Sequence, residues 1–167
     1  SGSDCASGKA ALDIALLDWV GKKLSLPLYR LWGASPSTLP LSSFSIGIDN
    51  PDVIANRIRA ASSFPIYKIK LGGGNDEEIM LAVRESTSHV VRVDANEGWQ
   101  DRSLALEKIE WLASLNVEFV EQPMPADRLD DIAWLRESSP LPLVADEDVK
   151  QANDIPKLRG IYDGINI

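Results

Sequence analysis

Short apolar runs alternate with helix-like segments along most of this sequence. The apolar runs have the length and β-branched content of buried strands, and they occupy residues 41–48, 65–72, 89–99, 117–125, 141–148 and 162–167. The segments between them carry apolar residues at helical spacing, at residues 50–63, 75–87, 101–115, 128–138 and 151–160. This regular alternation predicts an α/β fold with a parallel sheet covered by helices.

The first 40 residues have a different pattern. Their apolar residues recur at helical spacing, at Ala11, Ile14, Ala15 and Trp19. This spacing predicts one helix that ends near Gly21, followed by a Pro- and Ser-rich loop at residues 33–40. We therefore expect two parts: a helix with its linker in residues 1–40, and the strand–helix repeat in residues 41–167. Trp19, Trp111 and Trp134 have apolar neighbours and are expected in the core.

Two architectures fit the repeat, a doubly wound open sheet and a (β/α)₈ barrel. The GxGxxG fingerprint of a dinucleotide site follows none of the predicted strands. A complete barrel needs about 250 residues, whereas this sequence has 167. We therefore predict a partial (β/α)₈ barrel that carries the first six of eight strands.

Charge and composition restrict the function classes. The formal net charge of −8 argues against a nucleic-acid partner, which requires a basic face. A single cysteine, Cys5, cannot build an intrachain disulfide framework, so a reducing cytoplasm is the expected compartment. The sequence contains no run of 18 apolar residues, and we expect no membrane association. The expected partner is a small-molecule substrate.

Charged residues occupy equivalent positions on consecutive predicted strands. In residues 65–72, Lys68 and Lys70 alternate with apolar positions, so both lysines are expected to face the barrel interior. The next three strands each end in a carboxylate: Asp94, Glu121 and Asp146. Because barrel enzymes collect their catalytic groups at the carboxyl ends of the strands, we expect these residues to converge there.

Three converging carboxylates repel one another unless a cation neutralises them. Their hard oxygen atoms suit Mg²⁺, with Mn²⁺ as a substitute. A neutral lysine amine can abstract a proton from carbon, and a second cation nearby favours the neutral form. Any one carboxylate at a strand end is more commonly a helix cap or a loop residue. The ordered series on consecutive strands is what favours a metal-dependent proton transfer.

The same segments resemble the enolase superfamily, in its muconate-lactonizing and dipeptide-epimerase branch. The matching phrases are SFSIGIDNP, YKIKLG, RVDANEGW, VEFVEQPMP, LPLVADED and YDGINI, and the N-terminal helix resembles the segment that precedes the barrel. The resemblance implies that Lys70 is the proton-abstracting base and that Lys68 is its partner and a substrate contact. It also implies Mg²⁺ ligands at Asp94, Glu121 and Asp146, a substrate contact at Ser45, and supporting positions at Asn96 and Glu147.

The resemblance implies a Mg²⁺-dependent epimerase acting on a dipeptide such as L-Ala-Glu, with three alternatives open. Two alternatives are muconate cycloisomerase and o-succinylbenzoate synthase, which use the same residues. The third is a non-catalytic metal-binding fragment, which would not need the two lysines. A homo-oligomeric parent also stays open. Family members of this type usually read Ala-Asp-Glu-Ser where this chain has Asp148 at the last position, which either leaves metal affinity unchanged or shifts it. In epimerases that this chain resembles, a further lysine follows the INI phrase of the sixth strand and acts on the opposite face of the substrate, whereas here that phrase ends at Ile167. We therefore expect these 167 residues to exchange the α-proton weakly and without epimerisation.

Overall fold

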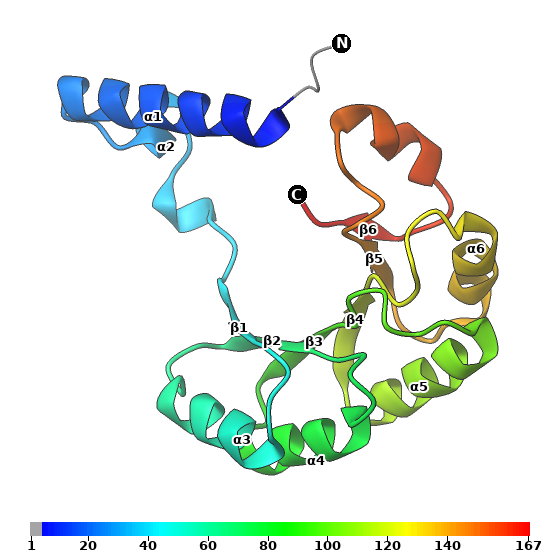
Figure 1. Cartoon of the computed structure of the whole chain (residues 1–167). Coiled ribbons are helices and arrows are strands. Elements are labelled where there is room, and N and C mark those ends of the chain that lie inside the picture. The colour runs from blue at the N-terminus through cyan, green and yellow to red at the C-terminus, as the bar shows by residue number, and fades with distance from the viewer. Residues whose placement is uncertain (1–4) are drawn as a thin grey trace. The chain divides into compact units, whose positions relative to one another are not determined.

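A computed structural model describes residues 5–167 of the chain (Figure 1). The chain divides into two compact units, one ending at Pro40 and one running from Leu41 to Ile167. The first unit contains helix α1 (Ala6–Leu24), the short helix α2 (Leu28–Leu31) and a 3₁₀ turn, η1 (Pro36–Thr38). The last two lie in stretches where the sequence predicted a loop or no element. None of the described helices combines the length and the apolar character that a membrane crossing requires.

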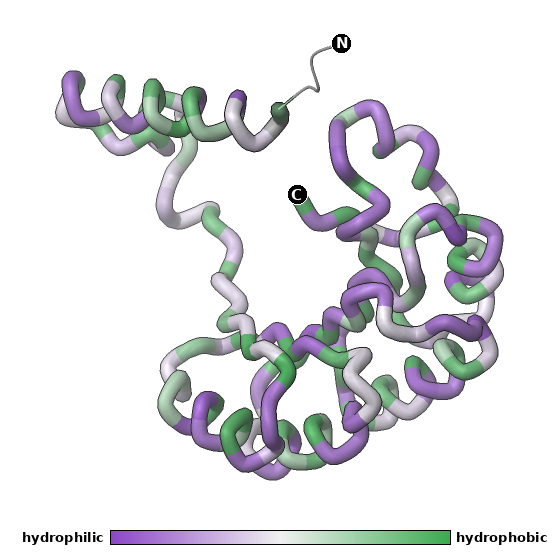
Figure 2. The backbone as a smooth tube through the Cα atoms, in the orientation of Figure 1, coloured by the Kyte–Doolittle hydropathy of each residue, from purple (hydrophilic) through white to green (hydrophobic). Residues whose placement is uncertain are grey.

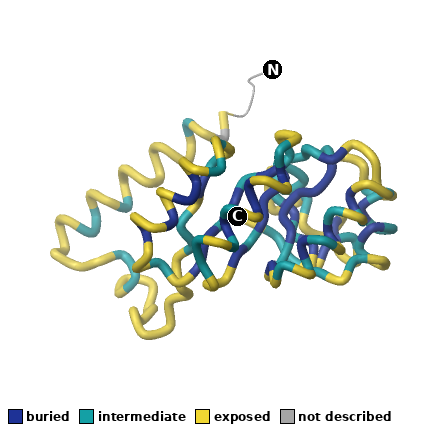
Figure 3. Tube along the Cα trace, turned by 90° about the horizontal axis from the view of Figure 1, so that it is seen from below, coloured by how far each residue is buried: buried dark blue, intermediate teal, exposed yellow. Residues whose placement is uncertain are grey.

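Helix α1 shows the expected helical recurrence of apolar residues (Figure 2), but most of its side chains are exposed (Figure 3). The prediction that Trp19 is a core residue is wrong, because 57% of its surface is exposed. Within its own unit the helix is accompanied in the described residues by α2 and η1, which are too short to cover an apolar face of this length. The Trp19 ring instead carries the Lys23 ammonium 4.7 Å from its centroid.

The second unit is built on one six-stranded parallel sheet. Its strands are β1 (Ser43–Ile46), β2 (Ile66–Lys70), β3 (Val90–Asp94), β4 (Val117–Glu121), β5 (Leu143–Ala145) and β6 (Gly164–Ile165). They are hydrogen-bonded in sequence order, and every pairing is parallel.

Helices follow the strands and lie on the outer side of the curved sheet (Figure 1). They are α3 (Pro51–Ala60), α4 (Asp76–Ser86), α5 (Arg102–Ser114), α6 (Leu129–Ser138) and the 3₁₀ helix η2 (Ala152–Leu158). A doubly wound sheet reverses its strand order and carries helices on both faces. The sequential order therefore confirms the predicted partial (β/α)₈ barrel.

Local sequence features explain where these elements start and stop. Asn50 caps α3 by accepting a hydrogen bond from the Asp52 N–H, and Asp101 caps α5 in the same way. The helix predicted at residues 151–160 is a 3₁₀ helix, because Pro156 lies inside it and cannot donate the backbone hydrogen bond of an α-helix. The predicted third and fourth strands end earlier than expected, at Asp94 and Glu121.

The core lies between the sheet and its helices. On β2, Tyr67 and Ile69 are buried on the helix side, whereas Lys68 and Lys70 are on the opposite face and remain partly exposed. The alternation along this strand therefore places both lysines on the inner face of the sheet, as the sequence predicted.

Candidate metal and proton-transfer site

The carboxyl ends of three neighbouring strands bring the predicted acidic residues together, and Lys70 ends the strand beside them. Register places Lys70 opposite Asp94, and Asp94 opposite Glu121, while Asp146 directly follows β5. One carboxylate oxygen from each of Asp94, Glu121 and Asp146 lies within 4.8 Å of the other two. Asp94 and Glu121 are buried, and Asp146 is half-buried.

Lys68 lies between two of these carboxylates. Its Nζ donates a hydrogen bond of 2.7 Å to Glu121 Oε1 and lies 3.1 Å from Asp94 Oδ2. Burial alone would lower the pKa of Lys68, but the hydrogen bond to Glu121 and the charge of Asp94 outweigh it, so this pKa is raised. The expectation that the two lysines favour each other's neutral form is therefore wrong at Lys68, because two carboxylates lie closer to it and stabilise its charge.

Lys70 occupies a different position on the same face. Its Nζ donates a 2.7 Å hydrogen bond to Asn96 Oδ1 and lies 3.4 Å from Asp94 Oδ2. The Asn96 amide in turn donates a 3.2 Å hydrogen bond to Glu147 Oε1. The backbone of Asn96 has φ of +43°, and its N–H donates to Asp94 Oδ1 over 3.0 Å. Asn96 and Glu147 thus lie next to the lysine and the carboxylates.

The donor set suits a divalent cation. Asp94 Oδ2 is buried and accepts no hydrogen bond of normal geometry, although the two lysine ammonium groups lie close to it. Burial raises the pKa of Glu121, and the nearby charge of Asp94 raises it further, while the hydrogen bond from Lys68 opposes both. A bound cation would relieve this repulsion and would use the free oxygen of Asp94.

Ser45 is placed near this group but is not bonded to it. It lies opposite Lys68 in the β1–β2 register and its side chain is exposed. Two residues that the sequence analysis did not select also belong here. Asn166 donates a 2.9 Å hydrogen bond to Glu121 Oε1, and Gln122 accepts a hydrogen bond of 3.0 Å from the Asp146 N–H. Asn166 directly follows strand β6, as Asp146 follows β5. This equivalent position is the feature of the sequence that could have identified Asn166 as a site residue.

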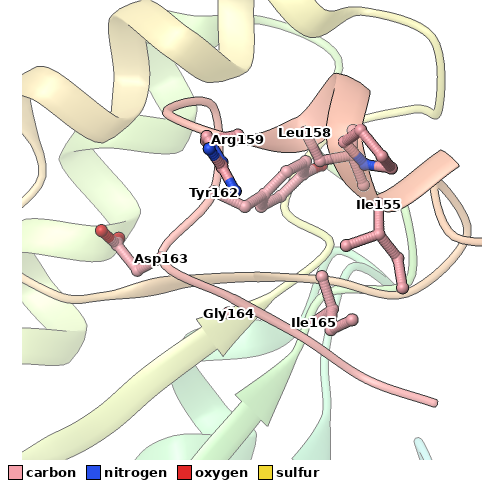
Figure 4. Close-up of a pocket in the computed structure, with 8 residues that line it drawn as sticks. Ile155, Leu158, Arg159, Tyr162, Asp163, Gly164 and Ile165 are labelled. Atoms are coloured by element: carbon pink, nitrogen blue, oxygen red, sulfur yellow. The ribbon is translucent and has the colours of Figure 1, made fainter.

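A cavity of 330 Å³ lies beside β6 and is separate from this site (Figure 4). Ile155 and Ile165 lie toward one end of it, and Arg159 and Asp163 toward the other. None of the carboxylates or lysines described above lines the cavity. Its walls are largely apolar, so we do not assign the proton-transfer chemistry to it.

Comparison with known proteins places this arrangement in a family. The family described as enolase C-terminal domain-like matches residues 53–165. The chain belongs to this family. The match runs from α3 to β6 and includes both site lysines, the three carboxylates, Asn96 and Glu147. Ser45 on β1 and Asn166 after β6 lie outside it.

Two named relatives are similar over nearly the whole chain. The L-Ala-D/L-Glu epimerase of Bacteroides thetaiotaomicron is 46% identical over 162 residues, covering 96% of this chain and 42% of the relative. The L-Ala-D/L-amino acid epimerase of Pedosphaera parvula is 44% identical over 165 residues, covering 96% of this chain and 48% of the relative. The chain thus spans less than half the length of these relatives.

Solved structures agree with the sequence comparison. The dipeptide epimerase from Enterococcus faecalis V583 superposes with a TM-score of 0.82 at 33% identity, covering 93% of this chain and 46% of that one. The dipeptide epimerase from Cytophaga hutchinsonii, complexed with Mg and the dipeptide D-Ala-L-Val, superposes with a TM-score of 0.78 at 28% identity, covering 92% and 44%.

Proposed function

We propose that the protein to which this chain belongs is a Mg²⁺-dependent dipeptide epimerase that removes the α-proton of an amino-acid residue. The observation that carries the proposal is the position of Lys70, whose Nζ lies 3.4 Å from Asp94 Oδ2 beside the group of three carboxylates. A base next to a cation site is the arrangement that proton abstraction α to a carboxylate requires. The names of the relatives support the same reaction class.

Asp94, Glu121 and Asp146 would hold the cation, since their oxygens already converge. A bound Mg²⁺ would supply positive charge to a substrate carboxylate and so stabilise the negative charge that develops when the neighbouring α-proton leaves. The α-carbon next to the free carboxylate of a dipeptide is therefore the position that this site would activate.

The residues of the chain have distinct tasks in this proposal. Lys70 takes the α-proton at Nζ, and the hydrogen bond to Asn96 holds that nitrogen in place. Lys68 balances the charge of Asp94 and Glu121 and contacts the substrate. Ser45, exposed on β1 across from Lys68, offers a hydroxyl to the substrate. Glu147 orients the Asn96 amide through its 3.2 Å hydrogen bond.

Hydrogen exchange at the α-carbon tests the proposal on this chain. The chain is incubated with L-Ala-L-Glu and Mg²⁺ in D₂O, and proton NMR follows loss of each α-hydrogen. We expect deuterium to enter the Glu α-position in the wild-type chain, while Lys70→Met reduces the exchange rate to that of the buffer. Chelation of Mg²⁺ should have the same effect as the substitution.

A matched control separates loss of the base from loss of any lysine. Lys150 is exposed and lies outside the group of site residues, so Lys150→Met should exchange like the wild type. Equal rates in the wild type and Lys70→Met would contradict the assignment of Lys70 as the base. Exchange at the Ala α-position at the same rate as at Glu would contradict activation through the free carboxylate.

A further inference from the structure

A buried amide lies directly behind the carboxylate group. Gln122 follows Glu121 at the end of β4, is fully buried and has φ of +36°. Its Oε1 accepts hydrogen bonds from the backbone N–H groups of Asp146 at 3.0 Å and Asp148 at 3.4 Å. Its Nε2 donates to Met124 O over 3.0 Å. The side chain thus joins the loop after β4 to the loop after β5.

Asp148 and Tyr162 complete this connection. Asp148 Oδ2 accepts hydrogen bonds from the Tyr162 hydroxyl at 2.7 Å and from Gln122 Nε2 at 2.9 Å, and Asp148 Oδ1 accepts one of 2.9 Å from the Asp127 N–H. Tyr162 is buried, and its ring lies beside Leu158 at the wall of the cavity in Figure 4. The three side chains of Gln122, Asp148 and Tyr162, here called the Gln122 cluster, therefore join the loop after β4, the loop after β5 and the segment that enters β6.

The placement of Asp146 depends on this cluster. Among the described residues, the hydrogen bonds made by Asp146 involve its backbone: its N–H donates to Gln122 Oε1, and its carbonyl accepts from the Val149 N–H at 2.8 Å. Its half-buried carboxylate is thus positioned through the main chain, unlike that of Asp94 or Glu121, which ends a strand. Movement of the loop after β5 would carry this carboxylate away from the other two.

We propose that Asp148 and Tyr162 are positioning residues for metal binding, which act through Gln122 to hold Asp146 in reach of the cation. The inference rests on the proposed function, because it assumes that Asp146 is a ligand. Partners that orient a metal ligand from outside typically change metal affinity by about 10- to 100-fold when they are lost. The cluster has the same task here, but it acts on the backbone of the ligand.

Titration of the chain with Mn²⁺ alone, followed by calorimetry, tests this role. Tyr162→Phe keeps the ring and removes the hydroxyl that donates to Asp148. We expect it to weaken Mn²⁺ binding by about 10-fold or more. Asp148→Asn is a second variant of the same size. In the wild type, hydrogen-bond donors approach both carboxylate oxygens of Asp148. The amide that replaces the carboxylate has one acceptor oxygen, so its –NH₂ group must face one of these donors. We expect the same loss of affinity.

Tyr67→Phe is the matched control for a merely structural effect. The Tyr67 hydroxyl is also buried and donates to Ala61 O over 3.0 Å, but it points to the helix side of β2. Both Tyr→Phe variants should lower the thermal unfolding midpoint, whereas only Tyr162→Phe should lower Mn²⁺ affinity. If Tyr162→Phe and Asp148→Asn both bind Mn²⁺ like the wild type, while Glu121→Gln does not, the metal site stands and the positioning role is overturned. If the wild-type chain binds no Mn²⁺, both are overturned.

Discussion

Lys68 Nζ lies 2.7 Å from Glu121 Oε1, although strands β2 and β4 are separated by β3. The lysine side chain therefore crosses the inner face of the sheet and passes Asp94 on β3, at a distance of 3.1 Å from Oδ2. One ammonium group thus neutralises part of the charge of two buried carboxylates. A divalent cation held by the same carboxylates would act on the same charges. The Lys68 ammonium group and the bound metal ion are therefore energetically linked.

Removal of the Lys68 charge should make the fold more dependent on metal. In Lys68→Met, Asp94 and Glu121 keep their buried charges without this partner, and we expect a loss of about 2–4 kcal/mol in the free energy of unfolding without Mg²⁺. Thermal unfolding with and without Mg²⁺ measures the effect, and the midpoint should rise more with Mg²⁺ in the variant than in the wild type. Lys150→Met, at an exposed position, should respond to Mg²⁺ as the wild type does. A smaller response in Lys68→Met would contradict the linkage.

Glu121 should be required for binding of the cation. Glu121→Gln replaces a charged ligand by a weak neutral one at the same place, and we expect Mn²⁺ affinity to fall by more than about 10-fold. Glu118→Gln is the control, since it removes one carboxylate from the same strand at an exposed position where Glu118 pairs with Arg92. Calorimetry that gives equal Mn²⁺ affinity for the two variants would remove Glu121 from the ligand set.

The placement of the charged residues could be predicted because it follows from strand geometry. Side chains alternate along a strand, so the apolar neighbours of Lys68 and Lys70 determine the face that the lysines occupy. Parallel strands in sequence order bring their carboxyl ends to one edge, so Asp94 and Glu121 must lie near each other. These relationships depend on the repeat alone.

The remaining features depend on contacts that no local pattern encodes. Gln122 accepts its hydrogen bond from the Asp146 N–H at a position where its own backbone has φ of +36°, a conformation that is uncommon for a residue with a side chain and that the strand pattern does not predict. Trp19 has the spacing of a core residue, yet spacing shows only that a helix has an apolar face and gives no information about what covers it. The charge state of Lys68 likewise follows from two carboxylates on other strands.

Asp76 should make folding sensitive to acid. Burial alone would raise the pKa of this carboxyl, but hydrogen bonds from Trp99, Lys108 and the Gly72 N–H outweigh it, so the pKa is lowered from 3.8. A group whose pKa is lower in the folded state contributes stability above its unfolded pKa, and loses it as pH falls through the folded value. We therefore expect the wild type to lose more stability than Asp76→Asn when the pH falls below about 4.

Urea unfolding at a series of pH values measures this contribution. Near neutral pH, Asp76→Asn should be less stable than the wild type by about 1–3 kcal/mol, because it loses charge-assisted hydrogen bonds in a buried position. Trp99→Phe removes the indole N–H that donates to Asp76 Oδ2 over 3.1 Å, together with part of the buried ring, and leaves the other two donors to Asp76 in place. Its overall stability falls through lost packing, but the pH dependence of that stability should lie between those of the other two proteins. An identical pH dependence in the wild type and Asp76→Asn would show that Asp76 is not the group responsible.

The loop after Lys70 should tolerate a side chain at one glycine and not at another. Gly72 and Gly74 have similar φ values, +95° and +92°, so alanine is conformationally strained at both by about 1–2 kcal/mol. A Cβ on Gly74 would meet nothing within 4 Å, whereas a Cβ on Gly72 would lie 2.4 Å from Ala95 O and 3.0 Å from Gly98 Cα. These are backbone atoms of the loop that carries Asn96, and they cannot rotate away.

Gly72→Ala should therefore lose about 1–3 kcal/mol more stability than Gly74→Ala, which serves as the control for backbone strain. The clash also forces the end of β2, which carries Lys70, away from the loop that carries Asn96, although the two side chains are joined by a 2.7 Å hydrogen bond. We expect Gly72→Ala to slow α-hydrogen exchange of L-Ala-L-Glu at a temperature where both variants remain folded, and Gly74→Ala to leave it close to the wild-type rate. Equal exchange rates and equal urea midpoints in the two variants would mean that the close approach of Gly72 to Ala95 does not position the base.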